Sequence, residues 1–569
     1  MHKARATSFL LSIALIFSAN AIPPPVPSAG VVERELEREF ESQLIPFRKD
    51  IPAIQIDMPD DCLEMPEGRS VFIQRIEILG NTCVADQEIL NAIGECLNCD
   101  LTLRDIYELC HIIDQYYAAC GYFLARTYPP PQDIKNGILT LEVIEGCLGN
   151  IEVVGNCYYS ECFIRSYFTA LQNRPLRYDE FLRALMLVND NSDLIVGSVF
   201  EKGEEFGCAD VILRVSDARP VHLYLNANDY GRDLTTNTRG GGRLDYGNLF
   251  LYGDTLSIAE VVGLPVNALY FTDIRYTAPI NRQGTYLGAG YLYSQFKIEE
   301  LKNLRLRGRS DIATLRVDQA LIRDRYLSVD LFTYFDFKQI ENYVLGHRVS
   351  YDKLRVLTIG GFLDYFCPCF SHDYLTFSFS AGIPKFLGGL KAVDKQSSRI
   401  GGGGQFFIFN ADYDRLQMLP QDTFLFFHAS GQLSPSKLTL PEQFYIGGSD
   451  TVRGYPLAVA LGDSGYYLNF EYRFPPPFFG NRSFFNTCAL WKDVVQFDLF
   501  FDQGGVFLNR KEEFFRNSAR NTFLCGTGLG IRVLGPYCLS LSVDMGIPLN
   551  HKDLTHGVFT YFKLTGQPF

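Results

Sequence analysis

The sequence predicts a mainly β protein: a 16-stranded antiparallel transmembrane β-barrel, preceded by an N-terminal helix and two tandem βααββ domains. Three observations lead to this prediction. From Asp217 to the end, short segments place apolar side chains at every second position, the period of a strand with one apolar face. The opposite face carries Asp, Arg, Gln, Ser, Asn and Gly, which suits a water-filled barrel better than a packed sandwich. The other two observations are an export signal and an internal repeat.

The N-terminus has the features of an export signal. Lys3 and Arg5 precede the apolar run "FLLSIALIF", and the small residues "ANA" follow where a signal peptidase would cut. We therefore predict a signal peptide at residues 1–21. No later stretch approaches roughly 20 uninterrupted apolar residues, so no membrane-spanning helix is expected. The formal net charge of -13 argues against nucleic acid as a partner, because binding phosphates requires a surplus of Lys and Arg.

Residues 22–69 are predicted to form one helix and a linker. In "VVERELEREFESQLIPF", apolar side chains recur at every fourth position from Val32 to Leu44, and the rest are mostly Glu and Arg. This spacing predicts an amphipathic helix at about residues 32–47 with one narrow apolar stripe. Such a helix can be a solvated linker or can occupy a polar lumen. Several prolines follow it and predict an extended linker up to residue 69.

An internal repeat predicts the two tandem domains. The segment "IEILGN" that begins at Ile76 recurs as "IEVVGN" at Ile151. In each copy a strand ends in Gly-Asn, helical patterns follow, and alternating apolar segments close the unit. The repeat therefore predicts βααββ domains at residues 70–145 and 146–216.

The barrel is predicted at residues 217–569. We count sixteen candidate strands from about Val221, or about 22 residues for each strand and its connector, which fits transmembrane strands of roughly ten residues. Phe569 ends the chain on the last amphipathic segment, "FTYFKLTGQPF". A C-terminal aromatic residue on the last strand is expected to be the signal for insertion into the outer membrane.

The connector at residues 435–463, between the eleventh and twelfth predicted strands, is unusually long and contains "FYIGGSDTVRGY". Long connectors tend to be functional. Gly447 and Gly448 permit a tight reversal, and Gly454 permits a close backbone approach beside Arg453. The arginine would be costly in lipid and ordinary in water. If the loop folds into the lumen, however, Arg453 could pair with a carboxylate on the barrel wall.

The segment "QFDLFFDQGG" offers such a carboxylate. If Phe497, Leu499 and Phe501 face the lipid, the alternation places Asp498, Phe500 and Asp502 toward the lumen, and the two glycines leave room for a loop tip. The alternative is that Arg453 is a solvated surface residue.

The remaining motifs do not predict catalysis, a metal site or a cofactor. The pair Cys96 and Cys99 lacks a second ligand pair, and "GGSDT" lacks the second glycine of a nucleophile elbow. The run "GGGG" at residues 401–404 lacks the Lys-Ser/Thr of a phosphate loop. Of the 15 cysteines, ten lie between Cys62 and Cys208; in an exported protein they can form disulfides or stay as buried thiols.

Taken together, these features resemble the two-partner secretion transporters of the haemolysin secretion and activation family, outer-membrane barrels that carry POTRA domains. The resemblance rests on "TYPPPQDIKNGILTLEVIEG" in the first unit, "IGGSDTVRGY" in the loop and "FFDQGG" on strand thirteen. It implies two POTRA domains and a plug helix in the barrel. It also implies that Arg453 pairs with Asp502, while Val452, Gly454 and Tyr455 complete the loop motif. The many cysteines are not part of the family pattern.

The resemblance further implies a function. An unfolded exoprotein would dock on the POTRA domains in the periplasm and cross the bacterial outer membrane through the barrel. The implied partners are this secreted polypeptide, outer-membrane lipid and the barrel assembly machinery. Two alternatives are an assembly factor that inserts other barrels and a porin or adhesin barrel. Two POTRA units and a plug helix favour secretion over assembly.

Overall fold

A computed structural model describes most of the chain: residues 29–32, 34, 36, 54–56, 70–94, 98–134, 136–231, 235–266, 268–298, 305–368, 370–485, 489–509, 521–535, 538–554 and 557–568. The predicted signal peptide, most of the predicted linker and Phe569 lie outside these residues. Within the described part, no helix is both long and apolar enough to cross a bilayer.

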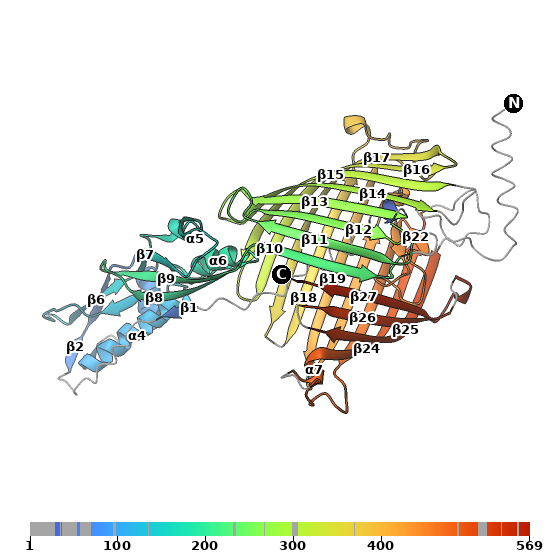
Figure 1. Cartoon of the computed structure of the whole chain (residues 1–569). Helices are drawn as coiled ribbons and strands as arrows, with labels where there is room; N and C mark the ends of the chain where they lie inside the picture. The colour runs from blue at the N-terminus through green and yellow to red at the C-terminus, as the bar shows by residue number, and fades with distance from the viewer. Residues whose placement is uncertain are drawn as a thin grey trace.

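Sixteen antiparallel strands form a closed barrel, which confirms the predicted fold class (Figure 1). Consecutive barrel strands pair in chain order, and the last strand pairs with the first. The strands are β10 (Val221–Asn228), β11 (Arg239–Gly247), β12 (Thr255–Gly263), β13 (Leu269–Pro279), β14 (Thr285–Ile298), β15 (Leu306–Arg323), β16 (Leu327–Val344), β17 (His347–Cys367), β18 (Ser371–Gly382), β19 (Phe406–Leu419), β20 (Thr423–Leu433), β23 (Ser464–Phe474), β24 (Val495–Phe507), β25 (Asn521–Leu534), β26 (Ser540–Pro548) and β27 (Phe559–Gly566).

The alternation along β24 shows why these segments form a barrel wall. Asp498, Phe500 and Asp502 are buried on the lumen side, while Leu499 and Phe501 are exposed on the outer face. The lumen also contains a polar cavity of about 690 Å³, whose lining includes charged side chains from several strands: Asp273, Arg275, Asp336, Lys338, Asp412 and Asp414. The wall is therefore apolar outside and polar inside.

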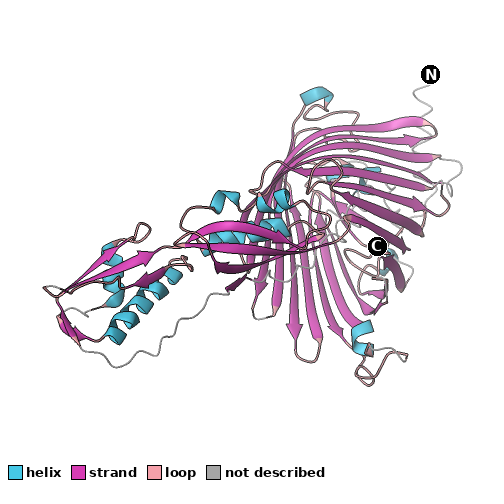
Figure 2. Cartoon of the chain, turned by 60° about the vertical axis from the view of Figure 1, so that its left-hand side comes forward, coloured by secondary structure: helices cyan, strands magenta, loops and turns pink. Residues whose placement is uncertain are grey.

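Two α/β units precede the barrel and extend away from it in a row (Figure 2). The first consists of β3 (Arg75–Leu79), α3 (Asp86–Ile93), α4 (Leu103–Ala119), β5 (Arg126–Tyr128) and β6 (Ile138–Ile144), with the small ribbon β2 (Val71–Ile73) and β4 (Cys99–Leu101) beside them. The second consists of β7 (Cys147–Val154), α5 (Glu161–Arg165), α6 (Tyr178–Asn189), β8 (Leu194–Lys202) and β9 (Cys208–Asp217). In both units the last strand pairs parallel with the first and antiparallel with the strand before it.

The repeated Gly-Asn pair ends the first strand of each unit in the same way. Gly80 and Gly155 have φ angles of 83° and 98°, which favour glycine. A Cβ atom at Gly80 would lie 2.3 Å from a backbone oxygen of the last strand, and one at Gly155 would lie 2.5 Å from such an oxygen. The side chains of Asn81 and Asn156 each donate to the carbonyl three residues later, at 3.0 and 2.8 Å. The sequence repeat is therefore also a repeat of contacts.

A carboxylate closes the turn that follows each Gly-Asn pair. Glu145 accepts hydrogen bonds from the backbone nitrogens of Thr82 and Cys83, both at 2.6 Å. Asp217 accepts hydrogen bonds from three successive backbone nitrogens at residues 157–159. Burial alone would raise the pKa of Glu145, but the hydrogen bonds from Thr82 and Cys83 outweigh it, so the pKa lies below its ordinary value.

A segment of the linker adds a strand to the second unit. Strand β1 (Ile54–Ile56) pairs parallel with β8, so the sheet order is β1-β8-β9-β7. This pairing covers the edge of β8, whose backbone groups would otherwise lack strand partners on that side.

A disulfide between Cys147 and Cys208 joins β7 to β9 in the second unit. Cys367, at the end of β17, is also disulfide-bonded. Disulfides therefore account for some of the cysteines that the family pattern lacks.

Candidate functional site

The long connector at residues 435–463, hereafter the lumen loop, folds back into the barrel as a hairpin. Its two arms pair as short antiparallel strands, β21 (Phe444–Ile446) and β22 (Ala460–Gly462). Side chains from the hairpin form a buried apolar cluster with residues of the barrel wall: Phe444, Ile446, Val452, Tyr455 and Ala460 from the loop, and Tyr467, Val506 and Leu524 from the wall. The loop is thus packed against the inner surface of the barrel.

Gly447 and Gly448 make the reversal between the two arms. Their φ angles are 104° and 112°. A Cβ atom at Gly447 would lie 2.5 Å from the carbonyl oxygen of Pro456, so the position has no room for a side chain. The hydroxyl of Thr451 accepts a hydrogen bond from the backbone nitrogen of Gly447 at 2.8 Å. This turn places Arg453 at the tip of the loop.

Arg453 contacts two carboxylates of the wall. Its Nε and Nη2 donate to the two oxygens of Asp502 at 2.8 and 2.9 Å, and its backbone nitrogen donates to Asp502 at 3.0 Å. Its Nη1 donates to Glu471 at 2.7 Å. The guanidinium carbon lies 3.6 Å from the ring centroid of Phe500, a cation–π contact. Because the Arg453 side chain is only 4% exposed, these contacts are shielded from water.

Gly454 brings the loop backbone against the wall. Its φ is 96°, and a Cβ atom there would lie 2.9 Å from the backbone of Ile547. A Cβ atom at Gly546 would in turn lie 2.4 Å from the nitrogen of Gly454. The hydroxyl of Tyr561 accepts a hydrogen bond from that nitrogen at 3.1 Å and donates to the carbonyl of Tyr455 at 2.9 Å. Sequence reasoning did not identify Tyr561, which lies on the last strand.

Val452 and Tyr455 complete the contact with the wall. Both are fully buried. A Cβ atom at Gly504 would lie 2.9 Å from the Val452 side chain, so the glycines after Asp502 do leave room for the loop tip. The Tyr455 hydroxyl, with one proton to donate, lies within hydrogen-bond distance of two acceptors: the carbonyl oxygen of Cys525 at 3.0 Å and the side-chain oxygen of Asn550 at 2.6 Å.

Arg453 belongs to a larger buried network of charges that the sequence did not predict. Glu471 also accepts two hydrogen bonds from Arg473, at 2.7 and 2.9 Å. Arg532 lies 3.2 Å from Asp544 and 3.6 Å from Asp498. The pairing of β23 with β24 places Glu471 opposite Phe500 and therefore on the same inner face. Glu471 could have been predicted from the alternation along β23, the strand next to Asp502, because that alternation places Glu471 on the lumen side.

A second buried pair, Arg399 and Asp463, anchors the base of the lumen loop. Arg399 comes from the connector between β18 and β19, and its guanidinium donates to both carboxylate oxygens of Asp463. The same carboxylate accepts hydrogen bonds from the backbone nitrogens of Leu438 and Asn509, both at 2.9 Å. The Arg399 and Asp463 side chains are 3% and 0% exposed. Asp463 thus ties together three connectors at this rim of the barrel, and the sequence analysis missed it.

The N-terminal helix lies between the lumen loop and the wall. Residues 29–32, 34 and 36 are helical, so the helix starts before the predicted residue 32; the predicted part beyond residue 36 lies outside the described residues. Val32 and Leu36, two members of the predicted stripe, are buried against the inner wall of the barrel. Arg34 donates to the carbonyl oxygens of Leu440 and Gln443 in the loop. The helix therefore occupies the lumen, the second of the two settings left open by its sequence.

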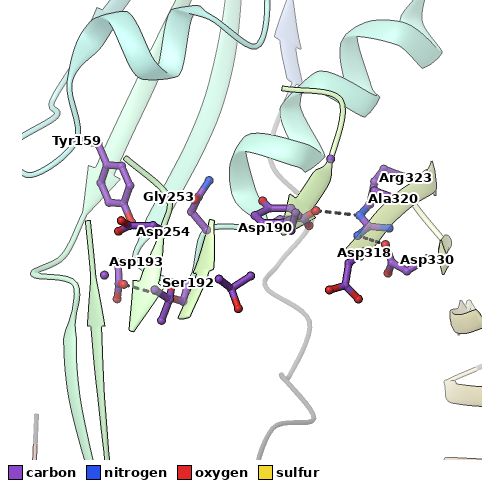
Figure 3. Close-up of a pocket in the computed structure, with 16 residues that line it drawn as sticks. Tyr159, Asp190, Ser192, Asp193, Gly253, Asp254, Asp318, Ala320, Arg323 and Asp330 are labelled. Carbon is purple, nitrogen blue, oxygen red and sulfur yellow. Dashed lines mark hydrogen bonds and ion pairs between the residues drawn. The ribbon is translucent and has the colours of Figure 1, made fainter. Parts of the chain in front are cut away.

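The joint between the second α/β unit and the barrel surrounds an acidic cavity of about 460 Å³ (Figure 3). Arg323 of β15 bridges Asp190 of the unit and Asp330 of the barrel, at 3.0 and 2.6 Å. In the turn between β13 and β14, the guanidinium of Arg282 lies 4.4 Å from the ring centroid of Phe163 in α5. These contacts join the unit to the barrel at its periplasmic rim.

The fold and the loop in the lumen together define an outer-membrane barrel with POTRA domains on its periplasmic side. The family model of the haemolysin secretion/activation protein ShlB/FhaC/HecB matches residues 207–533, and that of the ShlB-type POTRA domain matches residues 71–146. The chain belongs to this family, and its barrel is an outer-membrane transporter for two-partner secretion.

Curated relatives and solved structures agree with this assignment. The heme/hemopexin transporter protein HuxB of Haemophilus influenzae is 22% identical over 549 residues, which cover 94% of each chain. The outer membrane transporter CdiB of Escherichia coli is 23% identical over 430 residues, which cover 71% of this chain and 69% of CdiB.

Among solved structures, Escherichia coli CdiB superposes with a TM-score of 0.74 at 17% identity, covering 97% of this chain and 100% of CdiB. BamA from Haemophilus ducreyi lacking POTRA domains 1–3 reaches a TM-score of 0.51 at 12% identity, covering 87% of this chain and 100% of that one. At these identities the likeness concerns the fold alone.

Proposed function

We propose that secretion through this barrel depends on a latch, formed by Arg453 of the lumen loop and Asp502 of the wall, which fixes the loop inside the lumen. The observation that supports the proposal is the buried fork between the two side chains, with hydrogen bonds of 2.8 and 2.9 Å. Charge-assisted pairs of this geometry are strong and specific. Removing one partner of a buried pair typically costs about 3 to 5 kcal/mol, because the other charge is left without compensation.

The substrate in this proposal is an unfolded exoprotein that docks on the POTRA domains by adding a strand. The pairing of β1 with β8 supports this, because a short extended segment already pairs with that edge. In the first unit, β5 is the topological equivalent of β8, and β6 is its only strand partner among the described residues. An exoprotein segment can therefore pair with β5 or replace β1 on β8.

The lumen loop and the N-terminal helix both occupy the path through the barrel, so both must shift before a polypeptide can pass. We infer that this step uses no catalysis, cofactor or nucleotide, because folding of the exoprotein outside the cell would favour forward movement. The chain itself would depend on the barrel assembly machinery for insertion, with Phe569 as the signal, and on outer-membrane lipid around its apolar face.

Two-partner secretion is preferred to assembly of other barrels, the alternative that the sequence raised, because the N-terminal helix occupies the lumen, where Val32 and Leu36 pack against the inner wall. A porin or adhesin role is disfavoured by the occupied lumen.

The proposal is tested by an export assay in cells that produce a candidate secreted partner together with this chain. With the chain present, the secreted protein should appear in the medium; without it, the protein should accumulate in the periplasm. Release into the medium at equal levels without the chain would reject the proposed substrate. Loss of other outer-membrane barrels in the same cells would support assembly instead.

A further inference from the structure

One periplasmic turn of the barrel is far longer than the others. Antiparallel strands alternate in direction, so the turn after the twelfth barrel strand, β23, lies at the rim that bears the POTRA domains. This turn, residues 475–494, spans 20 residues, whereas the other six turns on that rim span 3 to 7. Periplasmic turns of outer-membrane barrels are ordinarily short. We call the described parts of this segment, residues 475–485 and 489–494, the aromatic hairpin.

The aromatic hairpin is folded around the only tryptophan of the chain, Trp491. The rings of Phe479, Phe484 and Phe485 lie with their centroids 5.1, 4.7 and 5.3 Å from that of Trp491. Backbone hydrogen bonds cross the hairpin, from Phe484 to Ala489 at 2.8 Å and from Trp491 to the carbonyl of residue 482 at 3.0 Å. The segment therefore has its own small aromatic core.

One further ring of the hairpin, Phe478, and one ring of the aromatic core, Phe485, are exposed. Phe478 is 90% exposed and Phe485 is 75% exposed, and Trp491 is partly exposed. Exposing rings of this size to water is unfavourable, and clustered exposed aromatics usually mark an interaction surface. The hairpin thus presents an apolar tip that needs a partner.

The outer face of the barrel continues directly into this tip. On β23 and β24, Tyr472, Phe474 and Phe497 stand on the lipid side, where the ring centroids of Tyr472 and Phe474 are 5.5 Å apart and those of Phe474 and Phe497 are 6.0 Å apart. Residue 475 begins the hairpin immediately after Phe474. The hairpin therefore extends an aromatic band of the kind that barrels place at the membrane surface.

The position of the hairpin favours lipid over a polypeptide held by the POTRA domains. In both views of the chain it stands at the barrel rim away from the two α/β units (Figures 1 and 2). Lys492 fixes it to the neighbouring turn through an ion pair of 2.7 Å with Asp422. Arg482 is exposed beside the rings. Aromatic rings with adjacent cationic side chains suit the interface between phospholipid headgroups and acyl chains.

We propose that the aromatic hairpin binds the phospholipid of the inner leaflet of the outer membrane, with Phe478 and Phe485 inserted at the headgroup boundary. The hairpin would then hold this sector of the periplasmic rim at a set depth while the POTRA domains and the lumen loop move. The proposal depends on the barrel standing in the outer membrane and not on which exoprotein it exports.

The single tryptophan allows a direct test. The full chain is reconstituted in phosphatidylcholine vesicles whose acyl chains carry bromine either near the headgroup or near the methyl end, since bromine quenches tryptophan only near contact. Loss of Trp491 emission is expected, and it should be greater with bromine near the headgroup. The double variant Phe478→Ser, Phe485→Ser should lose part of this quenching. Both side chains are exposed, so the barrel should still fold, which heat-dependent gel mobility checks.

Two matched variants calibrate the measurement. Trp491→Phe combined with Tyr472→Trp places the probe on the lipid-facing wall and should be quenched. Trp491→Phe combined with Phe206→Trp places it on the second α/β unit, where Phe206 is 82% exposed, and should not. If Trp491 behaves like the Phe206→Trp probe, the proposal is wrong. Trp491 emission that brominated lipid does not quench, but that shifts when the exoprotein is added, would indicate a polypeptide partner. This result would also reject lipid binding.

Discussion

Arg453 and Asp502 form a three-bonded contact inside the barrel: two hydrogen bonds join the guanidinium to the carboxylate at 2.8 and 2.9 Å, and the Arg453 backbone nitrogen adds a third at 3.0 Å. The two residues are 49 positions apart in the sequence, one on a loop and one on a strand. Their contact, together with the bond from Arg453 to Glu471, connects the tip of the lumen loop to two strands of the wall.

Replacing Arg453 tests whether the latch matters for secretion. Arg453→Ala should leave the barrel inserted but reduce export strongly, because Asp502 would remain buried without its counter-charge, at a cost of about 3 to 5 kcal/mol, whereas Glu471 would keep its bonds from Arg473. Arg453→Lys keeps the charge but not the planar fork, so it should restore only part of the export. The amount of exoprotein in the medium is measured and divided by the amount of folded barrel, which heat-dependent gel mobility reports. Normal export by the Arg453→Ala variant would show that secretion does not require the latch.

Two aspartates on the same inner face of β24 provide a matched comparison. Asp502 accepts the Arg453 fork, whereas neither oxygen of Asp498 has a hydrogen-bond partner among the described residues, although Arg532 lies 3.6 Å away. Asp502→Asn should therefore reduce export far more than Asp498→Asn. Both variants are compared at equal amounts of folded barrel. Equal effects would mean that any loss of lumen charge, and not the latch, governs export.

The Arg399 and Asp463 pair should control the extracellular end of the barrel. Asp463→Asn removes the buried negative charge that the Arg399 guanidinium contacts and weakens the hydrogen bonds to Leu438 and Asn509, an effect of about 3 to 5 kcal/mol. We expect the connectors at this rim to loosen and the variant to show larger and more frequent channel openings in planar bilayers. Unchanged conductance would limit the pair to a purely structural role.

The turn closed by Glu145 should depend on pH. The folded-state pKa of this carboxyl is lowered, so its stabilising contribution is fully present above its unfolded pKa and is lost as the pH falls through the folded value. Hydrogen exchange of the amides at Thr82 and Cys83 in the full chain should accelerate with acidification beyond the change in intrinsic exchange rate. In Glu145→Gln, exchange should be faster at neutral pH and should have lost this acid dependence.

Much of the fold was predictable because a barrel strand is specified locally. The alternation in "QFDLFFDQGG" separates Leu499 and Phe501 from Asp498 and Asp502 without knowledge of any other strand. The Gly-Asn repeat was likewise visible, because a positive φ and an asparagine turn are requirements of neighbouring residues.

The contacts that escaped prediction are long-range. Arg399 reaches Asp463 across 64 positions, and Tyr561 reaches Gly454 across 107, only because the barrel closes and the loop folds inward. The pairing of β1 with β8 was not predicted for a similar reason. A three-residue strand is too short to show an alternating apolar pattern, and its partner lies more than 140 residues away. The helix also begins earlier than its charged pattern suggested, since Ala29 lies before the first repeat of the stripe.

A double-mutant cycle on the latch tests the central claim most directly. Export is measured for the wild type, Arg453→Ala, Asp502→Ala and the double variant, each normalised to folded barrel. If the two side chains act together, the double variant should export about as well as the worse single variant, so that the effects are far from additive. If the losses multiply as independent effects, Arg453 and Asp502 do not act as one latch, and the account is contradicted.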